Sequence, residues 1–321
     1  MAKRRNRKPT ITQQIMNVCM ERINTKEHNL TRQNYQRTCY NFVRWCRENH
    51  DVKTYDEAKE LLQKYADDLQ QKGYSPSTIH SYLAGPCCGF NVKMDAIEKP
   101  RRIAADYTRS RFEPSCPSPS RDPYTEKVRR ITELQIRTGI RKSELYYLRN
   151  KNFKQDESGY WCVEVENGKG GKYQLNRLLE CDVEFIRGYF DPSKPDEYIF
   201  TQEEIQASAA VDLHRLRAQC AKNYYYHLLA RIKADPSYAE QLEAEIRKRW
   251  NLYNIDKKTG KPKHLKKSLI QGDYVLRGEL RKKAIREGKD YRFSKICLLA
   301  TSMFKLSHYR NNIVVASYLY T

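Results

Sequence analysis

The chain has 321 residues, 39% of them hydrophobic, so it is long enough for two folded domains with a core in each. Lys and Arg number 60 against 39 Asp and Glu, which leaves a net charge of +21. This excess favours a polyanionic partner, most simply nucleic acid, because a protein that neutralises phosphates releases counterions. A basic surface without a dedicated partner is the alternative.

Cysteine spacing and hydropathy indicate the compartment. Ten cysteines are scattered without a CxxC pair, so their spacing predicts no zinc site, and no secretory signal precedes them. Apolar runs such as ICLLA and NIVVA are too short to cross a bilayer. We therefore expect reduced thiols in a soluble, cytoplasmic protein with no membrane partner.

The first hundred residues predict a bundle of helices. An apolar pattern of helical period starts at Ile11, a second follows Thr31 as a candidate N-cap, and a third runs from about Tyr55 to Gly73. The stretch SPSTIHSYLAG begins with a cap and a first-turn proline, and we expect its helix to close at Gly85–Pro86. Apolar stripes of this kind are typical of a core.

Proline and serine then interrupt the periodicity in PSCPSPSRDP. This predicts a linker at 106–123 between a helical domain at 1–105 and a second domain at 124–321. The basic stretches EKPRR and TRSRF before the prolines, like the basic N-terminal tail, would either follow a phosphate backbone or be solvated.

The second domain begins with a helix in TEKVRRITELQIRTG. The strands YWCVEVEN and KYQLNRL, joined by GKGG, predict a β-hairpin, and helices resume from about Asp182. The predicted fold class is therefore mainly α with a small β-sheet, an α+β second domain. For 223–292 we expect a helix, a basic loop and a further helix, whose role is open between a DNA contact, a protein contact and a solvated insertion.

Four segments of the second domain carry candidate functional side chains. Each is weak alone, because an RxxE pair is common on helix surfaces, a turn lysine is usually solvated, and a His/Arg pair fits an ordinary amphipathic helix. The segments are TGIRKSELYYLR with Arg141 and Glu144, ENGKGGKYQ with Lys169 and Lys172, DLHRLRAQ with His214 and Arg217, and LSHYRNNIVVASYLYT with His308, Tyr318 and Tyr320.

Taken in order, these segments resemble the boxes of the tyrosine recombinases, the integrase family. TGIRKSEL is similar to the family's TGxRxSEL, GKGGK to GKGxK, HRLRA to HxLRH, and LSHYRNNIVVASY to LGHxxxxxxxxxY, while SPSTIHSYLAG resembles the end of its helical core-binding domain. The resemblance covers nearly the whole chain. The chain departs from the pattern at Ser307, where the family has glycine, at Ala218, where the fuller box has histidine, and in the long 223–292 segment.

The resemblance implies a site-specific recombinase that cleaves and rejoins DNA through a 3′-phosphotyrosyl link without metal or cofactor. Such an enzyme integrates or excises a mobile element or phage in a prokaryotic cell. Arg141 and Arg217 would clamp the nonbridging oxygens of the phosphate, where charge accumulates in the transition state. His308 would donate a further hydrogen bond to these oxygens.

The remaining roles follow from the same resemblance. Tyr318 has the family's spacing from His308 and would be the nucleophile, whereas Tyr320 would pack. A phenol is mostly protonated at neutral pH, so His214 would accept its proton, and Lys169 would protonate the departing 5′ oxygen. Glu144 would be a buried residue that orients these groups; an exposed helix pair is the alternative.

The implied partners are double-stranded attachment sites, three further copies of the chain in a synaptic homotetramer, and accessory DNA-bending or excision factors. Two other functions remain open at this point. One is a topoisomerase of the type that uses the same tyrosine chemistry, and the other is a catalytically inactive DNA-binding regulator. Whether the tyrosine acts within its own protomer or in a neighbour also remains open.

Overall fold

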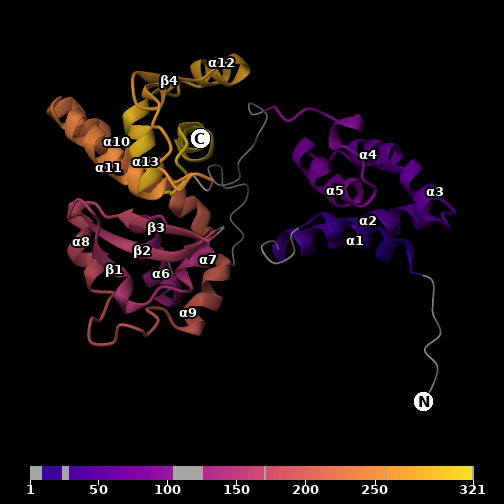
Figure 1. Ribbon diagram of the computed structural model, residues 1–321, viewed down its shortest axis with the longest axis horizontal. Coiled ribbons are helices and arrows are strands. Elements are labelled where there is room, and N and C mark those ends of the chain that lie inside the picture. The colour runs from indigo at the N-terminus through magenta and orange to yellow at the C-terminus, as the bar shows by residue number, and fades with distance from the viewer. Residues whose placement is uncertain (1–8, 24–28, 104–125, 170, 257, 320–321) are drawn as a thin grey trace. The chain divides into compact units, whose positions relative to one another are not determined.

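The computed structural model describes residues 9–23, 29–103, 126–169, 171–256 and 258–319. The chain divides into two compact units, 1–106 and 107–321, which we describe separately (Figure 1). The predicted fold class is confirmed, because the structure is mainly helical with a small antiparallel sheet. The predicted linker at 106–123 lies outside the described residues. No helix in the described ranges is both long and apolar enough to cross a bilayer.

The first unit is a bundle of helices around one apolar core. Thr10 and Thr54 cap their helices with side-chain hydrogen bonds. Ser75 caps another helix, which starts with Pro76, as the sequence predicts. The helices are α1 (Ile11–Arg22), α2 (Asn29–Asn49), α3 (Tyr55–Glu60), α4 (Leu62–Gln71) and α5 (Pro76–Gly89), followed by a 3-10 turn, Met94–Ala96.

Three features of the helices in this unit differ from prediction: the start of α2, a break at Leu61 and the end of α5. Helix α2 begins at Asn29, so Thr31 lies in its first turn and is not the N-cap. The predicted third helix is broken at Leu61, where ψ is 0°, into α3 and α4. It ends shortly before Gly73, whose φ of 74° is a left-handed conformation that glycine adopts without strain.

The predicted end of α5 at Gly85–Pro86 is wrong, because the helix continues to Gly89. Proline removes one backbone donor but does not stop this helix, since close packing holds the turn in place. A Cβ on Gly85 would lie 2.6 Å from the carbonyl oxygen of Tyr35 in α2, and a Cβ on Gly89 would lie 2.8 Å from that of Ile15 in α1. The two glycines allow α5 to lie directly against α1 and α2.

The second unit starts with helices and a sheet. Its first elements are α6 (Glu126–Thr138), α7 (Lys142–Leu145), a 3-10 turn (Asn150–Asn152), β1 (Phe153–Gln155), β2 (Trp161–Gly168), β3 (Lys172–Arg177), α8 (Glu180–Arg187), α9 (Gln202–Ala207) and a 3-10 turn (Ser208–Ala210). Strands β2 and β3 form the predicted hairpin, with Cys162 opposite Arg177. Strand β1 pairs antiparallel with β2 and was not predicted, because three residues are too few to show a period.

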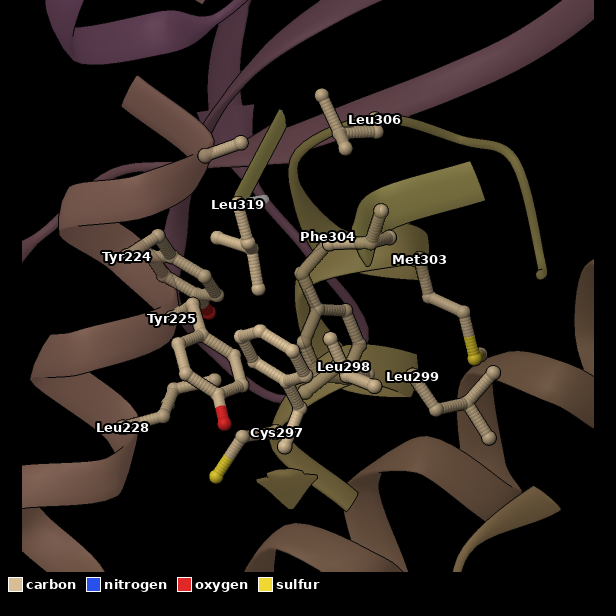
Figure 2. Packing of buried hydrophobic residues seen from close by; sticks show 14 of the residues in the cluster. Tyr224, Tyr225, Leu228, Cys297, Leu298, Leu299, Met303, Phe304, Leu306 and Leu319 are labelled. Carbon is tan, nitrogen blue, oxygen red and sulfur yellow. The ribbon is translucent and has the colours of Figure 1, made fainter. Parts of the chain in front are cut away.

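The rest of the unit is a helical layer around a second core. Its elements are α10 (Leu213–Ala234), α11 (Tyr238–Tyr253), a 3-10 turn (Lys267–Leu269), β4 (Asp273–Val275), α12 (Gly278–Arg286), β5 (Arg292–Ser294), α13 (Lys295–Phe304), α14 (Asn311–Val314) and a π-helical turn (Val315–Leu319). Figure 2 shows Leu319 pointing toward the same cluster as Tyr224 and Phe304, so the last helical turn is anchored in this core.

The segment 223–292 is built into the fold and is not a solvated insertion. Helix α10 runs through Asn223 without a break, and α11 packs on α13. Leu242, Ile246 and Trp250 of α11 are buried in the same cluster as the end of the chain. The small β4–β5 sheet, which joins β4 of this segment to β5 at its end, was not predicted.

Candidate active site

Arg217 is positioned by the start of α10 and its side chain is fully buried. Its Nη1 donates to the carbonyl oxygen of Gly139, and its Nη2 donates to that of Leu306 at 2.9 Å. Its Nε faces the Oη of Tyr318 at 3.4 Å. Among the described residues no carboxylate forms an ion pair with this guanidinium. Burial lowers the pKa of Arg217, yet arginine remains charged in proteins, so an unpaired buried cation lies beside Tyr318.

Local sequence explains why Gly139 reaches this arginine. Gly139 ends α6 with φ 66°, which favours glycine, and turns its carbonyl toward α10. Gln135, one turn earlier, donates from Nε2 to the carbonyl of Leu213 at 2.9 Å. The end of α6 and the start of α10 are therefore joined next to His214.

Tyr318 lies in the π-helical turn at the end of the chain and is only 4% exposed. Its Oη lies 3.3 Å from Nε2 of His308. The ring of His214 lies edge-on to the Tyr318 ring, with the centroids 6.0 Å apart. The structure thus brings Arg217 and His308 to the tyrosine hydroxyl and the His214 ring against the tyrosine ring, although they are up to about a hundred residues apart in sequence.

Arg141 and Glu144 form the second half of the site. Arg141 Nη1 donates to Glu144 Oε1 at 2.7 Å, and its Nη2 donates to the Leu306 carbonyl at 3.4 Å, the same oxygen that Arg217 binds. Glu144 is 4% exposed, so it is not a surface helix pair. Its carboxylate also accepts from the backbone N–H of Arg141 and of Lys169 and from Gln174 Nε2. Burial alone would raise the pKa of Glu144, but Arg141 and these donors hold it below its usual range.

Lys169 lies in the turn between β2 and β3. Its backbone N–H is held by Glu144 at 3.1 Å, while its side chain is exposed. Gly168 leaves the space into which the buried amide of Gln174 fits, because a Cβ there would lie against that amide. Sequence reasoning missed Gln174, because strand alternation places it on the same face as exposed Lys172 and gives no signal for its burial.

His308 is held in a strained loop. The residues on both sides, Ser307 and Tyr309, have φ of 52° and 56°, and the His308 N–H donates to the Ser302 carbonyl at 2.9 Å. Burial, together with Arg217 and Arg141, lowers the pKa of His308 to about 3. The imidazole is therefore neutral at physiological pH, and its Nε2 can accept the proton that the Tyr318 hydroxyl donates while Arg217 donates to the same oxygen.

The charges at this site favour an anion. Four nearby cations lower the pKa of His308: Arg217, Arg141, Lys172 and Lys169. Glu144 is the carboxylate held within the site. A separate cavity of about 310 Å³ behind Glu144 is also lined by Glu164 and Glu166, so it does not suit a phosphate. No group of three or more metal-binding side chains is present among the described residues. Tyr320 lies outside them.

No protein-family model and no curated protein matches the chain. Among solved structures, the crystal structure of XerA recombinase aligns with 66% of this chain and 83% of its own length, at 15% sequence identity and a TM-score of 0.23. These comparisons leave the family to be inferred from the site. Of the nine residues singled out in the sequence, the structure joins seven through direct contacts, with the Lys169 side chain exposed: Arg141, Glu144, Lys169, His214, Arg217, His308 and Tyr318.

Proposed function

We propose that the chain is a tyrosine site-specific recombinase that cleaves and rejoins DNA through a 3′-phosphotyrosyl intermediate. The observation that carries the proposal is the environment of the Tyr318 hydroxyl. It lies 3.4 Å from Arg217 Nε and 3.3 Å from His308 Nε2, within a site whose cations exceed its carboxylates. A hydroxyl between a fixed guanidinium and a neutral imidazole can lose its proton as it attacks a phosphate.

In the proposed reaction the Tyr318 Oη attacks the phosphorus and the bond from phosphorus to the 5′ oxygen breaks. The phosphate stays joined to the 3′ end of the strand through tyrosine, so the bond energy is kept in the new ester. Lys169 gives a proton to the departing 5′ oxygen. Rejoining is the reverse step with the 5′ hydroxyl of a partner strand as the nucleophile.

The proton of Tyr318 needs an acceptor, and two imidazoles lie near it. The resemblance favours His214, whose ring is edge-on to the tyrosine. In the free protein Nε2 of His308 lies at hydrogen-bonding distance from the Tyr318 hydroxyl, and the low pKa of His308 keeps the imidazole neutral. An imidazole of such low pKa is a weak base, and a bound phosphate anion would raise its pKa. We therefore assign the initial acceptor to His308 or His214, with His308 turning to donate to the phosphate once the anion binds.

Arg141 and Arg217 would stabilise the charge that builds on the nonbridging oxygens. Both guanidiniums are already fixed by the Leu306 carbonyl, and Arg141 also by Glu144. Donors that need no rearrangement are the effective ones, and removing one such donor typically costs about 10²–10³ in rate.

The biological role that fits this chemistry is integration or excision of a mobile element or phage. The proposed partners are double-stranded attachment sites, a homotetramer of this chain, and accessory bending or excision factors. The first unit is proposed to be the core-binding domain.

The proposal is tested by trapping the covalent complex. The substrates are duplexes of randomised sequence with a nick beside each candidate phosphate. Cleavage there releases a short fragment, which diffuses away, so the covalent protein–DNA adduct cannot be religated. Wild type and Tyr320→Phe should give a slow-migrating protein–DNA band, and Tyr318→Phe should give none. An adduct that survives Tyr318→Phe would contradict the assigned nucleophile. Relaxation of arbitrary supercoiled plasmid without strand exchange would instead support the topoisomerase.

A further inference from the structure

Residues 254–256 and 258–269, here called the basic strap, lie between α11 and β4. Five of their lysines are exposed: Lys258, Lys261, Lys263, Lys266 and Lys267. Asp256 is the one acidic residue in the strap, as read from the sequence. The strap therefore carries a local excess of positive charge that the proposed chemistry does not use.

The strap is a folded element. Asp256 N–H donates to the Lys261 carbonyl at 2.8 Å, and Lys263 N–H donates to the Asn254 carbonyl at 2.9 Å. The Asp256 carboxylate accepts from the backbone N–H groups of Lys258 and Thr259, which closes the turn. The lysines are therefore presented from a fixed backbone, and ordering that backbone on binding would cost little entropy.

The strap is attached to the segment that joins His308 to Tyr318. Trp250 donates from Nε1 to the Lys263 carbonyl at 2.6 Å, and its ring lies 5.8 Å from that of Tyr309, the residue after His308. At the C-terminal end of the strap, Asn311, which begins the helix leading to Tyr318, donates from Nδ2 to the Leu269 carbonyl at 2.8 Å. The middle of the strap and its C-terminal end are thus joined to residues that are close in sequence to His308 and Tyr318.

A third contact joins the start of the strap to the lysine turn. Tyr253, directly before the strap, stacks on Tyr173, directly after Lys172, with ring centroids 5.5 Å apart. The basic strap and the turn that carries Lys169 and Lys172 therefore lie on the same side of the site.

The charge of the strap is not neutralised internally. Within the part of the chain that the structure describes, none of its five exposed lysines forms an ion pair, and the carboxylate of Asp256 is taken up by backbone donors. By contrast, exposed Lys151 and Lys194 pair with Asp196 and Glu197. Lysines without an ion-pair partner, on a fixed element beside the proposed cleavage site, are suited to bind DNA phosphates other than the one that is cleaved.

We propose that the basic strap binds the phosphate backbone of duplex DNA next to the phosphate that Tyr318 attacks. This inference rests on the proposed function, because it takes the same DNA as its ligand. The strap would hold the duplex against the site without reading its bases, since lysine acts on phosphate as a point charge. Its attachment to Tyr309 and Asn311 would also couple DNA binding to the position of His308 and Tyr318.

The test compares two triple variants that remove the same number of positive charges. The first is Lys261→Gln, Lys263→Gln and Lys266→Gln in the strap. The second, the control, is Lys151→Gln, Lys194→Gln and Lys233→Gln, exposed lysines of the same unit outside the strap. Affinity for a short labelled duplex of arbitrary sequence is measured by fluorescence anisotropy between about 50 and about 200 mM salt, where phosphate neutralisation dominates the dependence.

Log affinity falls as log salt rises, and the strap variant should reduce the magnitude of this negative slope by about 0.9 for each phosphate that the strap no longer neutralises, up to about 2.7 for three. The control should leave the slope unchanged. A reduction in magnitude of less than about 0.9, or an equal reduction in both variants, overturns the proposal. A change in oligomeric state with an unchanged slope also overturns it, in favour of a protein partner. Because this assay needs no cleavage, a lowered slope without any covalent adduct would leave the strap as a DNA-binding element and reject the recombinase.

Discussion

Replacing Glu144 by glutamine tests whether its carboxylate holds the site together. Oε1 accepts from Arg141 Nη1, Lys169 N–H and Gln174 Nε2, and Oε2 accepts from Arg141 N–H, all at 2.7–3.1 Å. The glutamine amide carries no charge, and its NH₂ group, which cannot accept a hydrogen bond, would face at least one of these donors. A hydrogen bond to a charged group contributes about 1.5–3 kcal/mol, and breaking a buried ion pair costs about 3–5 kcal/mol, so we expect a loss of about 3 kcal/mol in unfolding free energy.

Urea unfolding followed by circular dichroism measures this loss. Glu184→Gln is the matched control, because its carboxylate is 78% exposed and pairs with Arg187 on the surface, where a change within about 0.5 kcal/mol is expected. The folded-state pKa of Glu144 is lowered, so its contribution is complete above the unfolded value of about 4.3 and is lost as pH falls below it. A loss under about 1 kcal/mol at neutral pH, or one independent of pH in this range, would refute the reasoning.

Three further predictions concern stability. His308 is buried in its neutral form, so between pH about 3 and about 6.5 the unfolded state binds one proton more than the folded state, and the unfolding free energy rises with pH. His308→Gln should reduce this rise by up to about 1.4 kcal/mol per pH unit, and an unaltered rise would contradict the prediction. Ser307→Gly should stabilise by up to about 1 kcal/mol, because φ is 52°; a lower melting temperature would count against this. Gly85→Ala should destabilise by about 1–3 kcal/mol through the Tyr35 carbonyl, and unchanged thermal unfolding would oppose that packing.

The sequence predicted the helices and the main hairpin because their periods are long and their caps are local. It also singled out most residues of the site, though not Gln174, from the order of four short boxes. Arg217 and Tyr318, for example, stand about a hundred residues apart, and periodicity alone gives no reason for their contact. The resemblance supplied that link as an expectation, and the geometry around Tyr318 now gives it a physical basis.

Other features depend on tertiary contacts that the sequence does not display. The continuation of α5 through Pro86 follows from the packing of Gly85 against α2. The Leu306 carbonyl, which both arginines bind, is a backbone group and has no sequence signal. The position of the basic strap follows from Trp250 and Asn311, neither of which looks unusual in the chain.

The most direct test of the central claim is mass spectrometry of the trapped complex. After the nicked duplexes are captured and digested with protease and nuclease, the C-terminal peptide should carry a nucleotide attached through its 3′ phosphate to Tyr318. Fragmentation distinguishes Tyr318 from Tyr320, which stands two residues later. A nucleotide on another residue, a 5′ linkage, or no covalent peptide from any sequence in the library would contradict the account.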